Sequence, residues 1–404
     1  MADQGLNRHA KPGSRPNRDY VDILRELQDR TWWRSTAPTL AAPHVRDATS
    51  VDRLNNRLIV ATLPCWLIGM WNLGEQISVG MYIAGIDRLD GWRAALIEGV
   101  GLTIAPNNIL TNWLHGTLYF LPVFVTALIV AVFWEIVFSR QRKRPLDEGT
   151  LCTAWLFALI LPPTVTFFQI IYGMTAAMLI GKAIFGGTGR YLVSPPIIGI
   201  CILFFSYTNV LHGSEVWVPL PGFQEPTTLE LAILEGGVPA LLSVDYSWWV
   251  LFVGNQPGPF GVTSALGCLL GATYLIATGS ASWRIMAGSL VGLVATVAVI
   301  SSVAPADSIV LKTPWYWHLV LGGWAFGTVF LATDPTAAAA TRTGRWIFGI
   351  LVGVLTVVVR LTNPTYFEGV VFAILLASIF APLCDHFVIE RNIKRRQARV
   401  GQGS

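Results

Sequence analysis

Two adjacent threonines stand in "PLPGFQEPTTLEL" (219–231), a polar stretch in an otherwise very apolar chain. The hydroxyls of Thr227 and Thr228 directly follow Glu225 and Pro226. A threonine hydroxyl can be the attachment point of a cofactor, and it can equally cap the first turn of a helix. The residues therefore leave two interpretations open, a cofactor attachment point and a rigid turn between helices.

Ionisable residues inside apolar segments are a second source of chemistry, because a charge at membrane depth is costly and usually functional. Asp334 precedes a proline in "ATDPT", where an interrupted helix would present carbonyls and a carboxylate to a hard cation such as sodium. An Asx turn or a helix cap is the alternative role of this aspartate. Glu135 and Glu148 are further ion-pathway candidates, although both flank the basic run "RQRKR" (140–144) and could simply pair with it.

The cysteines predict no metal chemistry. The chain has five of them, and none belongs to a Cys-x-x-Cys pair. We therefore expect no iron–sulfur cluster and no zinc site from this chain alone, and no metal ligands are assigned. Most of the cysteines lie in or beside apolar runs, where a free cysteine is usually a small core residue.

Membrane helices must position these residues, as the composition of the chain indicates. Of the 404 residues, 53% are hydrophobic and 13% are charged, whereas a soluble domain has roughly 25% charged residues. The sequence predicts an all-α polytopic membrane protein, with the lipid bilayer as a partner and no nucleic-acid partner. The candidate spans are 57–72, 114–138, 150–161, 164–184, 195–208, 263–279, 283–303, 315–333, 345–361 and 367–383.

Two of these spans are too short to cross a bilayer alone. The third ends at Pro162–Pro163, and the fifth begins at Ser194–Pro195–Pro196. Short apolar segments interrupted by proline indicate broken helices, which occur at membrane depth where they line a cavity.

Basic residues orient the chain. The run 140–144 and the tail "RNIKRRQAR" (391–399) follow even-numbered spans, whereas 209–262 contains no Lys or Arg. The positive-inside rule then predicts cytoplasmic termini in a bacterial inner membrane and an external loop that holds Thr227.

Ten spans divide into two sets of five, and an odd number per half predicts inverted repeats. "LPPT" (161–164) ends the third span as "TDPT" (333–336) ends the eighth, and "SPP" (194–196) opens the fifth as "NPT" (363–365) opens the tenth. The predicted organisation is a cytoplasmic N-terminal segment, a first repeat, an external loop, a second repeat and a basic cytoplasmic tail: 1–56, 57–208, 209–262, 263–383 and 384–404.

Several strings together resemble the family of the B subunits of sodium-translocating NADH:quinone reductases and, more distantly, the D subunits of Rnf complexes. They are "HVRD" (44–47), "MWNLGEQ" (70–76), "FWEIVFS" (133–139), "DEGTLCTAWLFALILPPT" (147–164), "GKAIFGGTGR" (181–190), "SWRIM" (282–286), "WHLVLGGWAFGTVFLATDP" (317–335), "GRWIFG" (344–349) and "APLCDHFVIERNIKRR" (381–396). They follow the family's order over nearly the whole chain.

The resemblance implies a ten-helix fold like that of urea transporters. It implies a membrane subunit of a redox pump that couples electron transfer from flavin to quinone to Na⁺ or H⁺ translocation, among other membrane subunits. It also implies FMN on an external threonine, which aligns with Thr227, together with riboflavin and with quinone as substrate. The chain has no dinucleotide fingerprint, so NADH oxidation would belong to another subunit.

Three departures from the family's pattern fall where the family places its cofactors. Glu225 and Pro226 replace the small residues before the acceptor, so a carboxylate stands beside the incoming phosphate. Ser194 replaces an asparagine in the family's Asn-Pro-Ala motif, and Ile200 an arginine. Val262 replaces a glutamate, while Thr263 and Ser264 are retained.

Two further functions stay open beside the redox subunit. One is a divergent scaffold or ion-conducting subunit of a larger complex that has lost covalent FMN, and the other is a stand-alone solute channel.

Overall fold

The computed structural model is helical, and it contains no strand in the residues that it describes. These residues are 51–86, 88–89, 91–106, 108–143, 149–207, 216–220, 222–234, 236–304, 313–362 and 369–401. The predicted N-terminal segment lies almost wholly outside them, as does Glu148.

The first part of the chain forms two long helices with a short one between them, and then three shorter segments, the second of which ends in a π-helix. The elements are α2 (Val51–Ala84), α3 (Trp92–Gly99), α4 (Ile109–Arg142), α5 (Thr150–Ile160), α6 (Phe167–Ala176), the π-helix η1 (Ala177–Ala183) and α7 (Pro195–Ser206).

The second part begins with three short helices and ends with two long ones. Its elements are α9 (Thr228–Leu234), α10 (Val238–Ser243), α11 (Trp248–Val253), α12 (Ala265–Ala277), α13 (Trp283–Val303), the 3-10 turn η3 (Trp317–Leu319), α14 (Trp324–Phe326), the π-helix η4 (Gly327–Leu331), α15 (Arg342–Thr362) and α16 (Gly369–Gly401).

Five described helices, α2, α4, α13, α15 and α16, are long and apolar enough to cross a membrane. Helix α4 contacts neighbours through small residues such as Ala127, while Ile129 and Phe133 are 63% and 56% exposed. Large apolar side chains on an outer surface suit a lipid environment. The shorter apolar segments α5, α6 with η1, α7 and α12 lie among these helices.

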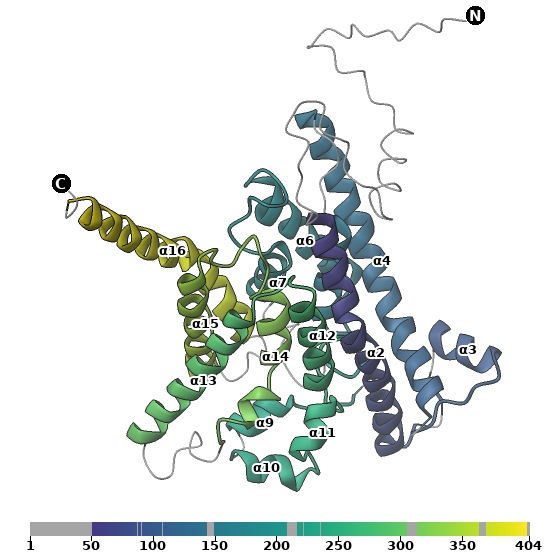
Figure 1. The fold of residues 1–404 in the computed structure, drawn as a ribbon. Helices are drawn as coiled ribbons and strands as arrows, with labels where there is room; N and C mark the ends of the chain where they lie inside the picture. The colour runs from purple at the N-terminus through teal and green to yellow at the C-terminus, as the bar shows by residue number, and fades with distance from the viewer. Residues whose placement is uncertain are drawn as a thin grey trace, which may run out of the picture.

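Helices α2 and α4 run side by side (Figure 1), and glycines bring them into very close contact. A Cβ on Gly116 would lie 2.0 Å from the Met70 carbonyl oxygen, and one on Gly74 would lie 2.0 Å from the Asn112 carbonyl oxygen. Only glycine permits this backbone approach. Helix α2 also extends well past the predicted span 57–72, because polar side chains in its second half are buried against α4 rather than left in lipid.

The predicted interruptions are present. Helix α5 ends at Ile160, immediately before Leu161 and the two prolines, and α7 begins with Pro195 at its first turn. A third interruption splits the predicted span 315–333, where Gly322 and Gly323 have φ of 58° and 63° between η3 and α14. Glycine adopts these left-handed angles without a steric penalty, so the chain can turn there.

The ends of the molecule differ in character. Helices α9, α10 and α11 gather at one end, and the last part of α16 extends away from the rest of the chain (Figure 1). We call the end with α9–α11 the loop end. We call the end with Arg57 and Arg142 the basic end; there Arg57 donates to the Thr278 carbonyl, and Arg142 donates to the Ala183 carbonyl.

Candidate functional site

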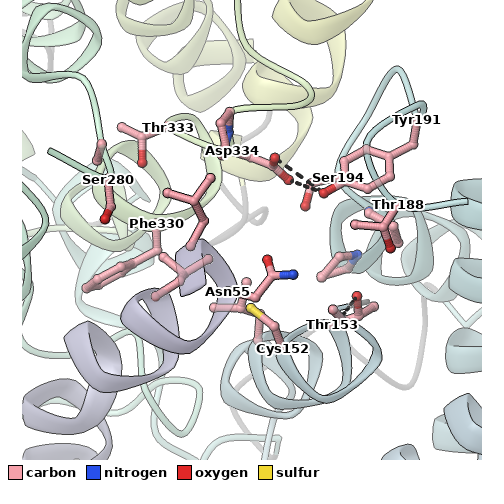
Figure 2. A pocket seen from close by; sticks show the side chains of 18 of the residues that line it. Asn55, Cys152, Thr153, Thr188, Tyr191, Ser194, Ser280, Phe330, Thr333 and Asp334 are labelled. Atoms are coloured by element: carbon pink, nitrogen blue, oxygen red, sulfur yellow. Dashed lines mark hydrogen bonds between the residues drawn. The ribbon is translucent and has the colours of Figure 1, made fainter. Parts of the chain in front are cut away.

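A pocket opens at the basic end, where the interrupted helices meet. It encloses about 580 Å³ of open space, counting its mouth, and the starts of α2, α5 and α7 and the ends of α12 and η4 surround it. Its polar lining residues are Asn55, Thr153, Thr188, Tyr191, Ser194, Ser280, Thr333 and Asp334 (Figure 2). Apolar side chains, among them Leu58, Leu156 and Phe330, complete the wall.

Asp334 is the charged group of this pocket. Its carboxylate accepts hydrogen bonds from the Tyr191 hydroxyl at 3.0 Å and from the Thr336 amide at 2.9 Å. The second bond closes the Asx turn that the sequence suggests as its alternative role. Ser194, which precedes α7, lies against the same carboxylate (Figure 2). The Asx turn is therefore compatible with the predicted role of Asp334 as a cation ligand, since the turn points the carboxylate into the pocket.

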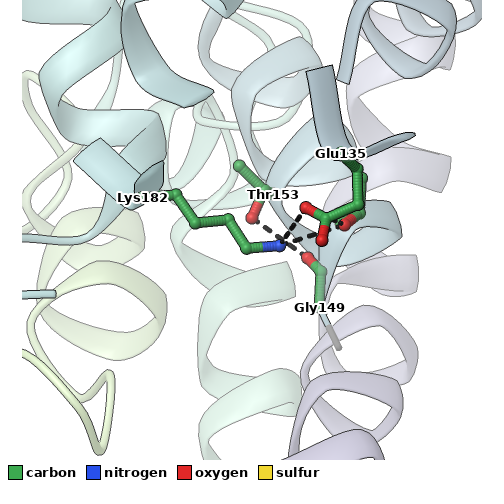
Figure 3. Close-up of polar contacts among 5 residues, drawn as sticks. Glu135, Gly149, Thr153 and Lys182 are labelled. Carbon is green, nitrogen blue, oxygen red and sulfur yellow. Dashed lines mark hydrogen bonds and ion pairs between the residues drawn. The ribbon is translucent and has the colours of Figure 1, made fainter. Parts of the chain in front are cut away.

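A second buried charge cluster adjoins the pocket. The Lys182 ammonium lies 2.9 Å from the Glu135 carboxylate and donates to the Thr150 hydroxyl at 3.0 Å (Figure 3). The Thr150 hydroxyl itself lies 3.3 Å from the same carboxylate. Lys182 belongs to η1, and π-helical turns often occur at functional sites. The sequence identified Glu135 as a candidate. It suggested the basic run 140–144 as the partner of this glutamate and did not indicate Lys182.

The loop end contains the two threonines. Thr227 is 5% exposed, and its hydroxyl accepts a hydrogen bond from the Glu230 amide at 3.2 Å. It thereby caps α9. Thr228 is 2% exposed and donates to the Gln256 side chain at 2.6 Å. Both hydroxyls are therefore buried and already engaged.

The acid before these threonines is engaged too. Glu225 accepts a hydrogen bond from the Tyr246 hydroxyl. Burial raises the pKa of Glu225, while the Tyr246 hydrogen bond acts in the opposite direction. The same burial, with the Glu225 charge, raises the pKa of Tyr246.

Gln256 connects the remaining candidates. Its side-chain amide donates to the Thr263 carbonyl at 2.8 Å. Ser264 caps α12 by accepting from the Gly267 amide at 3.0 Å. The Thr263 hydroxyl is buried and has no hydrogen-bond partner among the described residues. Thr263 and Ser264 thus position the start of α12, next to the capped threonine loop.

The candidate residues therefore form two groups rather than one. Ser194 and Asp334 share the pocket at the basic end, with Glu135 next to it. Thr227, Thr263 and Ser264 belong to the loop end, joined through Gln256.

Sequence reasoning missed several buried polar residues. Asn112 of α4 donates to the Glu75 carboxylate of α2 at 2.5 Å and accepts from Ser78 at 2.9 Å. Farther along this network, Gln76 donates to Asn255 at 2.8 Å. The polar run in "MWNLGEQIS" (70–78) is the signal that could have found Glu75, because it follows the apolar run "LIVATLPCWLIGMW" (58–71) in the same helix.

No group of three or more His, Cys, Asp or Glu side chains that could hold a metal ion occurs in the part of the chain described. The five cysteines are buried and unbridged. Cys65 and Cys268 approach each other at 3.7 Å between their sulfur atoms, across the contact of α2 and α12.

Long apolar helices, interrupted helices between them and the Asp334 carboxylate at one interruption define a polytopic membrane protein with a polar site between its helices. Comparison with known proteins specifies the class. The NQR2, RnfD, RnfE family matches residues 39–394, and the chain belongs to this family.

Relatives match it from end to end. The B subunit of the Na⁺-translocating NADH-quinone reductase of Pseudomonas aeruginosa (strain LESB58) is 40% identical over 399 residues, 98% of each chain. The B subunit of the same reductase from Stutzerimonas stutzeri (strain A1501) is also 40% identical, over 98% of this chain and 97% of its own. The B subunit from Chromohalobacter salexigens is 39% identical, over 98% of this chain and 95% of its own.

Proposed function

We propose that this chain is a membrane subunit of an Nqr- or Rnf-type respiratory complex, which couples electron transfer from flavin to quinone to translocation of Na⁺ or H⁺. One structural observation carries the proposal: the Asp334 carboxylate is held at a helix interruption and lines a polar pocket between the two halves of the chain. The full-length similarity to the B subunits of Na⁺-translocating NADH-quinone reductases supports the same function.

The proposed fold has ten spans in two inverted sets of five. Corresponding helices have corresponding neighbours, which supports it: α4 packs on α6 as α13 packs on α15, and α6 packs on α7 as α15 packs on α16. The third element of each half also stops short, α5 at Ile160 and η4 at Leu331. The boundaries at 57–208 and 263–383, with the loop 209–262 between them, remain part of this proposal.

The proposed orientation places the basic end and both termini in the cytoplasm of a bacterium and the loop end outside. The gathering of Arg57, Arg142, Arg342 and the basic tail at one end supports it through the positive-inside rule.

In this function Asp334 and Glu135 are carboxylates of the ion pathway, as is Glu148, which lies outside the described residues. Each described carboxylate has a local neutralising or hydrogen-bonding partner, Tyr191 for Asp334 and Lys182 for Glu135. A cation that enters the pocket would exchange for these partners, because a carboxylate at membrane depth needs compensation.

The lining of the pocket suits a small organic ligand. Small-molecule sites typically combine an apolar wall with a few convergent polar groups, as this pocket does. The Asn55 side-chain amide is buried at this pocket without a hydrogen-bond partner among the described residues, so it can donate to a ligand. Riboflavin or quinone is the proposed occupant, with Asn55, Ser194 and Tyr191 to orient it.

Covalent FMN does not fit the loop end. A phosphoester on Thr227 would require its hydroxyl to leave the α9 cap and would place a charged phosphate in a buried position two residues from Glu225. We therefore also propose that this subunit carries no FMN on Thr227, as a divergent family member whose outer cofactor site is closed.

Purification from native membranes tests both proposals. Co-purified redox subunits and a sodium-stimulated quinone reductase activity are expected, and a chain that purifies alone without such activity would overturn the function. On a denaturing gel we expect no flavin fluorescence at 44.2 kDa, with a 40%-identical relative from Pseudomonas aeruginosa run beside it as reference. A fluorescent band that disappears in Thr227→Val would show that the bond is made after all.

A further inference from the structure

The last part of α16 leaves the body of the protein. Asp385 marks the point of departure: its carboxylate accepts hydrogen bonds from the amides of Ala340 and Thr341 at 2.7 and 2.9 Å, just before α15 begins. Beyond Asp385 the helix continues to Gly401 and extends away from the other helices (Figure 1). Every side chain from 391 to 399 is exposed. We call residues 386–401 the C-terminal arm.

Helix α16 is too long to be only a membrane span. With a rise of 1.5 Å per residue, 33 residues extend roughly 50 Å, whereas a hydrocarbon core is about 30 Å thick. Because Asp385 fixes α16 to the start of α15 at the basic end, the excess length emerges there as the arm.

The arm is strongly basic. It contains five Lys or Arg residues and one acid, Glu390, which pairs with Lys394 at 2.8 Å. Arg391, Arg395 and Arg399 follow a spacing of four and form a row along one side of the helix.

Exposed apolar side chains accompany these charges. Phe387 is 60% exposed, and Ile389 and Ile393 are each 49% exposed. Ile389 and Ile393 are four residues apart, roughly on the opposite side of the helix from the arginine row. The two kinds of side chain are interleaved, since Phe387 continues the arginine row and Arg396 lies three residues from Ile393. Exposed basic and apolar residues together, on a helix that continues a membrane span, suit the boundary between headgroups and acyl chains.

We propose that the C-terminal arm binds the anionic lipid headgroups of the leaflet from which α16 emerges. Charge complementarity supports this occupant, because phosphate headgroups attract clustered Lys and Arg residues that follow a membrane helix. Continuity supports it too: the arm extends a membrane-spanning helix without a break, so its first turns start at the headgroup level. An acidic surface of another subunit would not require the exposed isoleucines.

Fluorescence of the full-length protein in nanodiscs tests this. The five native cysteines are buried, so a bimane label can be placed on Gln397→Cys in the arm and on Thr343→Cys in the body at the same end. Quenching by headgroup-level nitroxide lipids is then measured. We expect it to rise at least about twofold at position 397 when roughly a third of the lipid is phosphatidylglycerol instead of phosphatidylcholine. Thr343→Cys should not respond, and about 0.5 M NaCl should abolish the rise by screening.

Neutralisation variants provide the matched control. Replacing Arg391, Lys394, Arg395, Arg396 and Arg399 with Gln should remove the rise at position 397, whereas Arg284→Gln with Arg342→Gln should keep it. Equal quenching in both lipid mixtures, or a rise that survives neutralisation, would overturn the proposal. The proposal would also be overturned if the label at position 397 became shielded from solvent only when other subunits are bound. None of these outcomes depends on flavin, quinone or sodium, so the proposed function is tested separately.

Discussion

The Lys182 ammonium and the Glu135 carboxylate form an ion pair of 2.9 Å with side chains only 3% and 9% exposed. The pair joins η1 to α4, two elements that the sequence alone does not bring together. Burial of both charges means that each needs the other.

Breaking this pair should be costly, and removing it whole should cost less. Lys182→Met leaves an uncompensated buried carboxylate, so we expect the free energy of unfolding to fall by about 3–5 kcal/mol. Glu135→Gln combined with Lys182→Met should restore much of that loss. Unfolding by SDS titration in mixed micelles measures both variants. Equal losses in the single and double variants would mean that the two charges are independent.

Asp334 should control the response to sodium. Asp334→Asn keeps the Asx turn but removes the charge, so we expect the half-saturating sodium concentration for quinone reduction to rise about tenfold or more, because ligand charge sets cation affinity. Tyr191→Phe removes one hydrogen bond and should produce a smaller change. Sodium titrations of the purified complex measure this. An unchanged sodium titration in Asp334→Asn would mean that Asp334 only forms the Asx turn and does not bind sodium.

Thr227 should behave as a helix cap. Thr227→Ala removes the acceptor of the Glu230 amide and should destabilise the protein by about 1 kcal/mol, whereas Thr227→Ser keeps an acceptor and should cost much less. Thermal unfolding followed by tryptophan fluorescence compares them. Identical melting of both variants and the parent would argue against the cap.

Glu225 should make the loop end sensitive to pH. Because burial raises its pKa above the ordinary 4.5, the folded protein binds this proton more tightly than the unfolded chain does. The resulting stability is fully present below pH 4.5 and is lost as pH rises through the raised pKa. The melting temperature of Glu225→Gln should therefore equal that of the parent near pH 4 and exceed it near pH 7. A constant difference across that range would contradict a raised pKa.

Two of the helix interruptions could be predicted from the sequence, because the proline pairs Pro162–Pro163 and Pro195–Pro196 bound short apolar runs. Single prolines are no such mark, since Pro64, Pro122 and Pro382 lie inside continuous helices. The break at Gly322–Gly323 was hidden inside a continuous apolar run, since only the backbone angles distinguish it. Periodicity could not detect it.

The candidate site was predicted only in part for a different reason. Asp334 and Glu135 stand out as charges in apolar segments, but their partners Tyr191 and Lys182 come from other elements. Spatial pairing of that kind depends on the packing of helices, which composition does not encode. The burial of Thr227, likewise, follows from how α9 packs and not from its neighbours in the chain.

The paired glycine contacts between α2 and α4 limit how the protein can move. Gly74 rests on the Asn112 backbone and Gly116 on the Met70 backbone, so sliding of one helix along the other would drive larger side chains into the gap. These two helices must therefore translate and rotate together. Any alternation of access between the two sides of the membrane would therefore have to move other elements against this pair.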